Sequence, residues 1–65
     1  MKAAIEEAIA KAKASGERET VQASDGAEAY AYPHRDGIAW GVNGPDGWNV
    51  LRGIRGADGK DVAVS

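Results

Sequence analysis

The chain begins with apolar residues at helical spacing and continues as short β-type segments. Ile5, Ala8, Ile9 and Ala12 recur at the i, i+3, i+4 and i+7 positions of one helical face, with charged residues between them. The first glycine of the chain follows this stretch, where a residue in the left-handed conformation would end a helix. The spacing predicts a helix over residues 2–15.

Four Asp-Gly dipeptides divide the rest of the chain at intervals of 10 to 12 residues. The segments between them are rich in Val, Ile, Tyr and Trp, and Asp-Gly between such segments is a strong hairpin signal, because glycine supplies the positive φ of the turn. We therefore expect an α+β fold, in which one N-terminal helix packs on a five-stranded antiparallel β-meander that is either an open, twisted sheet or a partial barrel. The meander spans 19–64, with strands over 19–24, 27–34, 38–43, 48–55 and 60–64.

The lengths of the hairpin loops decide which residues share a face, because a slip of one residue turns a strand over. Three-residue loops at Ser24-Asp25-Gly26, Pro45-Asp46-Gly47 and Ala57-Asp58-Gly59 keep apolar residues together. They pair Val21 with Ala29, Val42 with Val50, Ile38 with Ile54, and Ile54 with Val62. At the second turn, a two-residue Asp36-Gly37 loop pairs Ala31 with Val42 and Pro33 with Trp40, whereas a three-residue loop would turn Tyr30 and Tyr32 inward. We take the two-residue form.

This register predicts one apolar face of the sheet, covered by the helix through Ile5 and Ile9. Its members are Val21, Ala23, Ala27, Ala29, Ala31, Ile38, Trp40, Val42, Val50, Ile54, Val62 and Val64. On the opposite face Tyr32 is expected across from Gly41, where its ring would shield the glycine. The same register places Arg52 opposite Trp40, with the arginine stem across the indole. Arg55 is expected opposite Asp61 on the outer face.

Length, charge and cysteine content restrict the class of protein. A chain of 65 residues suits a single domain over 1–65, which buries only about 60% of the surface that the unfolded chain exposes. The chain has no cysteine and no apolar run of membrane-spanning length, so we expect a soluble, cytoplasmic protein with no membrane partner. The net charge of −2 comes without a basic stripe, which makes a nucleic-acid partner unlikely.

The sequence contains no motif for catalysis or for binding a metal or cofactor. His34 is the single histidine, no serine lies in a nucleophile turn, and no loop has the acidic spacing of a calcium site. We therefore expect no catalytic, cofactor or metal residues and no enzyme.

Polar and aromatic residues on the outer face predict a surface that binds a protein partner. We expect that surface to comprise Tyr30, Tyr32, Asn43, Asn49, Leu51, Trp48 and Glu28. Charged residues protect both edge strands, which favours a monomer or weak homodimer. The chain is similar to phage inhibitors of bacterial defence, such as anti-CRISPR proteins, in size, lack of cysteine and absence of catalytic motifs. Two alternatives are a designed scaffold without biological function and a binder of single-stranded nucleic acid.

Overall fold

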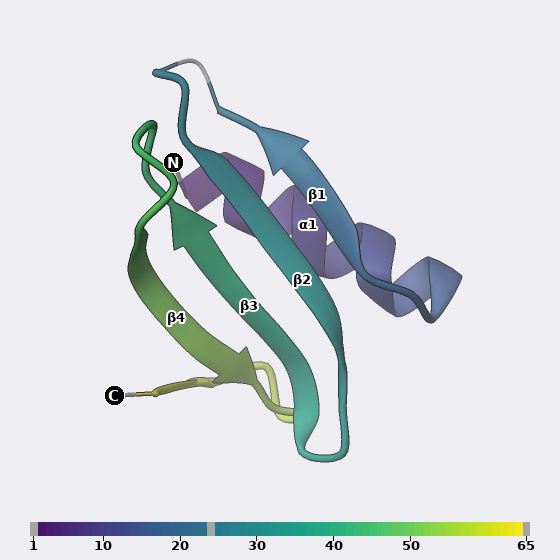
Figure 1. Cartoon of the computed structure of the whole chain (residues 1–65). Coiled ribbons are helices and arrows are strands. Elements are labelled where there is room, and N and C mark those ends of the chain that lie inside the picture. Colours follow the sequence, from purple (N-terminus) through teal and green to yellow (C-terminus); the bar gives the residue numbers. More distant parts are fainter. Residues whose placement is uncertain (1, 24, 65) are drawn as a thin grey trace.

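The computed structural model describes residues 2–23 and 25–64 and has one helix packed on one open sheet. The helix α1 (Lys2–Ser15) comes first, and each following strand pairs antiparallel with the next along the chain (Figure 1). The sheet is not closed, and β1 and β5 form its edges. The predicted α+β meander is therefore confirmed in its open form. The strands are β1 (Glu19–Gln22), β2 (Glu28–His34), β3 (Gly37–Asn43), β4 (Asn49–Arg55) and β5 (Asp61–Ala63).

Small residues allow α1 to approach the sheet closely. Its buried face is the predicted one with Ala4 added, and it packs on β1, β2 and β3. Ala8 and Ala12 on the helix and Ala29 and Ala31 on β2 have no exposed surface at all. The helix ends as expected, at a glycine in the left-handed conformation whose N–H donates to the carbonyl of Ala12. In the described residues no helix is long and apolar enough to cross a membrane.

Three of the four hairpins share one hydrogen-bond pattern. At the third turn, the N–H of Gly44 donates to the carbonyl of Trp48 (2.8 Å), and the N–H of Gly47 donates to the carbonyl of Gly44 (2.9 Å). Gly47 has a φ of 87°, and the Asp46 carboxylate accepts the N–H of Trp48. The same bonds recur at the fourth turn and at the first, where Ser24 lies outside the described residues. The three-residue loops and the pairs Val21–Ala29 and Ile54–Val62 are confirmed.

The second turn has the predicted length at a different position. His34 pairs with Gly37, so the two-residue loop is Arg35-Asp36, and the predicted loop Asp36-Gly37 is wrong by one residue. Gly37 begins β3 close to β4, where a Cβ would overlap the carbonyl of Arg55. Only glycine fits at this position, because the backbone of β4 occupies the space that a side chain would need. The pairs Ala31–Val42 and Pro33–Trp40 are therefore replaced by Ala31–Trp40 and Pro33–Ile38, a shift of two residues that leaves every side chain on its predicted face.

A β-bulge changes the faces of β4 and β5. Asn43 pairs with Asn49, as the three-residue loop requires, but the next pair is Val42 with Leu51, so Val50 has no partner on β3. The predicted pairs Val42–Val50 and Ile38–Ile54 are wrong, because one extra residue on β4 reverses the direction of every later side chain. Val42 belongs to the core beneath α1, so Leu51 and Arg55 point to the helix side and Ile54 points away from it. The residues wrongly assigned to the inner face are Val50, Ile54, Val62 and Val64.

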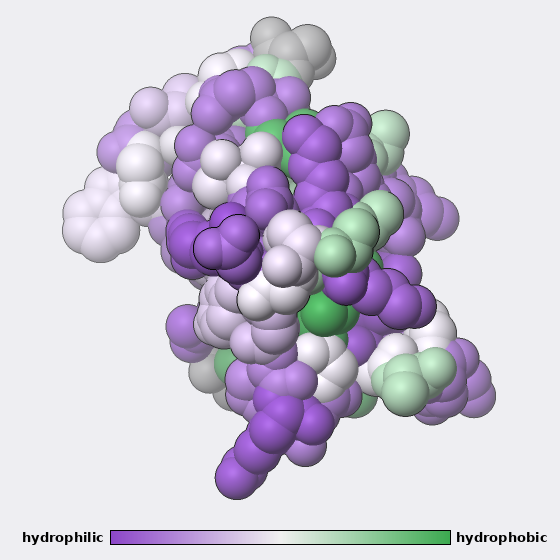
Figure 2. Space-filling model, turned by 90° about the vertical axis from the view of Figure 1, so that its right-hand side faces the viewer, coloured by the Kyte–Doolittle hydropathy of each residue, from purple (hydrophilic) through white to green (hydrophobic). Residues whose placement is uncertain are grey.

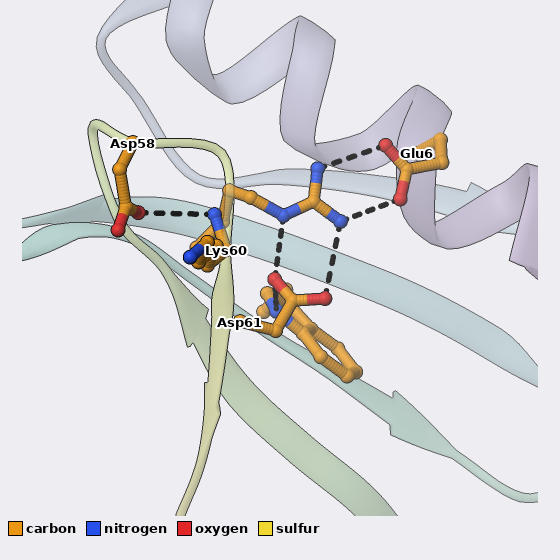
Figure 3. A network of polar contacts seen from close by, with 6 residues as sticks. Glu6, Asp58, Lys60 and Asp61 are labelled. Atoms are coloured by element: carbon orange, nitrogen blue, oxygen red, sulfur yellow. Dashed lines mark hydrogen bonds and ion pairs between the residues drawn. The ribbon is translucent and has the colours of Figure 1, made fainter.

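The bulge brings Arg55 to the helix side, where it bonds to Glu6 and Asp61. Figure 3 shows the network of polar contacts to which Glu6, on α1, and Asp61, on β5, belong. The Arg55 guanidinium donates two hydrogen bonds to Glu6 (2.9 and 2.6 Å) and two to Asp61 (2.5 and 3.2 Å). Asp61 also accepts the indole N–H of Trp40 at 3.3 Å. Arg55 faces Asp61 as predicted, but on the inner face of the sheet. Because α1 packs on β1 to β3, this network is the main polar link between the helix and the β4–β5 hairpin.

We expect Arg55→Met to destabilise the fold by about 1–2 kcal/mol, because it removes charge-assisted hydrogen bonds to two carboxylates that stay partly hydrated. A domain of this size would then lose roughly 4–16 °C in melting temperature, measured by circular dichroism. Arg35→Met is the matched control, since the Arg35 side chain is 90% exposed. An unchanged melting temperature for Arg55→Met would contradict the assigned role of the network.

Stability should also fall in acid. The hydrogen bond from Arg55 lowers the pKa of both Glu6 and Asp61. A carboxylate with a lowered pKa in the folded state adds stability that is complete above its unfolded pKa, about 4, and is lost as pH falls through the folded value. Urea midpoints should therefore stay level from about pH 7 to 5 and drop below about pH 4. The fall of the urea midpoint with pH should be shallower in Arg55→Met than in the parent. An equal fall in both proteins would mean that other groups cause the sensitivity to acid.

Candidate binding surface

The face of the sheet opposite α1 contains three cross-strand rows that the register defines. A polar row runs along one end, an aromatic and cationic row crosses the middle, and an apolar row follows it. The rows are Gln22–Glu28–Asn43–Asn49, then Thr20–Tyr30–Gly41–Arg52, then Tyr32–Ala39–Ile54–Val62. No part of α1 covers this face, which we call the outer face. It therefore grades from amide side chains at one end to aliphatic ones at the other.

Tyr30 lies flat against the backbone of β3. A Cβ at Gly41 would overlap the Tyr30 phenol, so the glycine makes room for the ring. Asn49 donates a hydrogen bond to the Tyr30 hydroxyl (3.1 Å), and its amide nitrogen also lies within 3.4 Å of the Asn43 side-chain oxygen. The hydrogen bond from Asn49 therefore fixes the hydroxyl of Tyr30, and Gly41 leaves the space that the ring occupies. Tyr30 is a positioned side chain on an otherwise open face.

Arg18 covers the two tyrosines. The rings of Tyr30 and Tyr32 are parallel to within 3°, with centroids 6.3 Å apart. The Arg18 guanidinium carbon lies 4.4 Å from the centroid of Tyr30 and 5.9 Å from that of Tyr32. Such a contact between a cation and ring faces is attractive because the π-electrons give the face of an aromatic ring a partial negative charge. The three side chains form one ordered unit, with Tyr30 and Tyr32 on β2 and Arg18 just before β1.

A shallow groove of about 160 Å³ runs beside this unit. Its floor includes Ala39, which is only 6% exposed although it lies on the outer face. Ile54 and Val64 line one side, and Arg52 lies at the rim. Val62 on β5 pairs with Ile54 and is 66% exposed. The groove is thus mainly apolar, with guanidinium and phenol groups along its edge.

Two cations on the outer face are not neutralised. Arg18 and Arg52 form no ion pair with any carboxylate in the part of the chain that the structure describes. Glu28, at the polar end, already accepts a hydrogen bond from Gln22 (2.9 Å). The outer face is therefore locally cationic in a chain whose net charge is −2.

The structure brings together most of the predicted surface and separates the rest. Tyr30, Tyr32, Asn43, Asn49 and Glu28 share the outer face, as predicted. The predicted position of Leu51 is wrong, since the bulge turns it to the helix side. Trp48 lies in the β3–β4 turn, next to Asn49, with 74% of its surface exposed.

Two contacts predicted from the register are also wrong. Gly41 lies across from Tyr30, while Tyr32 faces Ala39, because the second hairpin is displaced by two residues. Gly53, not Arg52, lies opposite Trp40, and a Cβ there would come within 2.8 Å of the indole. Arg52 is consequently free to extend over the outer face.

Sequence reasoning missed Arg18, Arg52 and Ile54 as members of the surface. A signal for Arg18 existed, because it precedes Thr20 by two residues and alternation carries the outer face back to it. No comparable signal marked Arg52 and Ile54, whose orientation depends on the bulge at Val50.

The other surfaces offer less chemistry. Seen from the side of α1 and β1, the molecule is mostly hydrophilic, and its hydrophobic areas are small and separate (Figure 2). A larger hollow of about 380 Å³ lies between α1 and the β4–β5 turn, but its arginine, Arg55, is already bonded to Glu6 and Asp61. Within residues 2–23 and 25–64, no three acidic or histidine side chains gather as a metal site would require.

Comparison with known proteins identifies no relative. No family model matches the sequence, and no curated protein or solved structure is recognisably similar to it.

Proposed function

We propose that the protein is a small, non-enzymatic binding module that acts by occupying a surface of a larger protein, as an inhibitor does. The observation that carries the proposal is the ordered unit of Arg18, Tyr30 and Tyr32 on an uncovered sheet face. Rigid aromatic and arginine side chains are the residues that contribute most of the affinity in protein interfaces. The apolar groove beside them provides contact area that water leaves readily on binding.

The single histidine of the chain helps to shape a turn. His34 accepts the backbone N–H of Asp36 at its Nδ1 atom (3.1 Å) in the β2–β3 turn. This bond serves to shape the turn, and none of the hydrogen bonds of the described residues joins His34 to a serine hydroxyl. The outer face is also broad and shallow, which suits a protein surface better than a small substrate.

Substitution of both tyrosines tests the proposal. A partner captured from a bacterial lysate by the intact protein would be purified, and its affinity measured by calorimetry for the parent and for Tyr30→Ala/Tyr32→Ala. We expect affinity to fall at least about tenfold, because truncation of central interface tyrosines costs about 1–2 kcal/mol or more. Lys11→Ala is the control, since that exposed side chain lies on α1, on the opposite side of the sheet, and it should bind as the parent does.

Equal affinity of a folded double variant would exclude the outer face as the binding surface. If the double variant is unfolded by circular dichroism, Tyr32→Ser alone gives the answer, because the Tyr32 ring does not shield Gly41.

A further inference from the structure

We propose that the outer face recognises an extended acidic segment, with two carboxylates placed on Arg18 and Arg52 and an apolar side chain in the groove between them. The inference rests on the proposed function and specifies the chemistry of its partner. Charge complementarity carries it, because these two guanidiniums are the cations of the face that no described carboxylate neutralises.

The position of Arg18 suits it to bind a carboxylate. A guanidinium in contact with a ring face still has N–H donors that can bind a carboxylate, because it carries five of them. The contact with Tyr30 and the proximity of Tyr32 also restrict the rotamers of a long side chain, so less conformational entropy is lost when a carboxylate binds. Arg18 is therefore suited to the bidentate pairing that guanidiniums form with carboxylates.

Arg52 provides the second cation on the far side of the groove. It belongs to the same cross-strand row as Tyr30, with Gly41 between them, and it lines the groove. Tyr30 and Arg52 are two strand spacings apart, which is about 10 Å. In an extended peptide, side chains at alternate positions point the same way, so the sequence Glu-x-apolar-x-Glu directs three side chains at the face. Its two carboxylates span about 13 Å, and the flexible glutamate and arginine side chains accommodate the difference.

The contact of Arg18 with the rings favours a peptide over single-stranded nucleic acid. Proteins that bind single strands stack bases on exposed aromatic faces. Here the guanidinium already lies against Tyr30 and close to Tyr32, so a base would have to displace it. Two unpaired arginines are also few for a phosphate backbone, and Glu28 at the polar end would repel it.

The test is an NMR titration of the ¹⁵N-labelled protein at low salt with the peptide Gly-Glu-Ser-Leu-Ser-Glu-Gly. We expect backbone amide shifts at Arg18, Tyr30, Tyr32, Ala39 and Arg52. The control peptides replace both Glu by Gln, or Leu by Ser, and both should bind at least about threefold more weakly. Added sodium chloride should weaken the Glu peptide selectively, because surface ion pairs are screened by salt.

Charge-removing variants assign the two cations. Arg18→Gln and Arg52→Gln should each weaken the Glu peptide by about threefold to tenfold and should leave the Gln peptide unaffected. Arg35→Gln removes the same charge from the β2–β3 turn and should bind as the parent does. The ¹⁵N spectrum of each variant shows directly whether it is folded. If a Gln variant is unfolded, a Lys variant at the same position replaces it, because lysine retains the charge but cannot form the bidentate pairing with a carboxylate.

Equal binding of the Glu and Gln peptides, or shifts that avoid the outer face, would overturn the inference. So would an oligo-dT strand that bound more tightly than the Glu peptide and depended on the same arginines, since it would identify a nucleic-acid partner. The proposed function fails separately, if the tyrosine double variant keeps full affinity for a captured protein. A protein partner that depends on the tyrosines and is indifferent to Arg18→Gln and Arg52→Gln would leave the proposed function standing and reject the acidic segment.

Discussion

Trp40→Ala should leave the protein largely unfolded at 25 °C. Trp40 is 8% exposed, belongs to the core beneath α1, and lies on Gly53 so closely that a Cβ there would contact the ring. Its indole N–H also donates to Asp61, so the substitution weakens the Arg55 network together with the core. Truncation of a buried tryptophan costs about 3–5 kcal/mol, which equals the whole stability that a core of this size usually provides. Far-UV circular dichroism and urea titration measure the loss.

The second tryptophan of the chain provides the control. Trp48 is 74% exposed, and Trp48→Ala should change stability by less than about 0.5 kcal/mol. Trp40→Phe retains most of the apolar volume and should remain folded with reduced stability, so it separates the loss of packing from a failure to fold. A folded Trp40→Ala variant within about 1 kcal/mol of the parent would show that Trp40 is not the centre of the core.

Ala8→Leu should destabilise the fold by about 2 kcal/mol and lower the melting temperature by roughly 8–16 °C. Ala8 has no exposed surface and belongs to the same buried cluster as Ala29 and Ala31, so three extra carbon atoms would force α1 away from the sheet. Ala10→Leu makes the same change on the exposed side of the same helix and should be nearly neutral, because leucine and alanine have similar helix propensities. Thermal melts of the two variants compare them directly. Equal melting temperatures would mean that the alanine contact is loose enough to accept a larger side chain.

Local patterns were sufficient to predict the elements and most of their pairing. The apolar spacing predicted the observed helix, and the Asp-Gly turns predicted five strands in meander order. These signals are local: they depend on helical periodicity and on the positive φ of the glycine that closes each three-residue loop. The face of β2 was also predicted correctly. A displacement by two residues at the second hairpin preserves the alternation, so Tyr30 and Tyr32 remain outside.

The candidate surface was predicted correctly on β2 and β3 and as far as Asn49 at the start of β4. Tyr30, Tyr32 and Asn43 were placed correctly because no irregularity separates them from the turns that set their register. Beyond Asn49 the prediction reversed, since hydrophobicity favours placing Val50, Ile54 and Val62 inside and the alternation does not reveal an extra residue in a strand. The groove and its second cation, Arg52, lie in this part of the sheet.

The sequence by itself determined the helix, the number of strands, three of the four turns that join them, and the aromatic residues of the outer face, because each depends on neighbours within a few positions. Only the tertiary structure decided which face of the sheet each side chain of β4 occupies. The bulge at Val50 turns Arg55 toward α1, where Glu6 and Asp61 bind it, and places Arg52 and Ile54 beside the tyrosines. The physical reason is that these contacts join residues far apart in the chain. Glu6 and Arg55 meet across a separation of 49 positions, and no local pattern of hydrophobic and polar residues encodes such a contact.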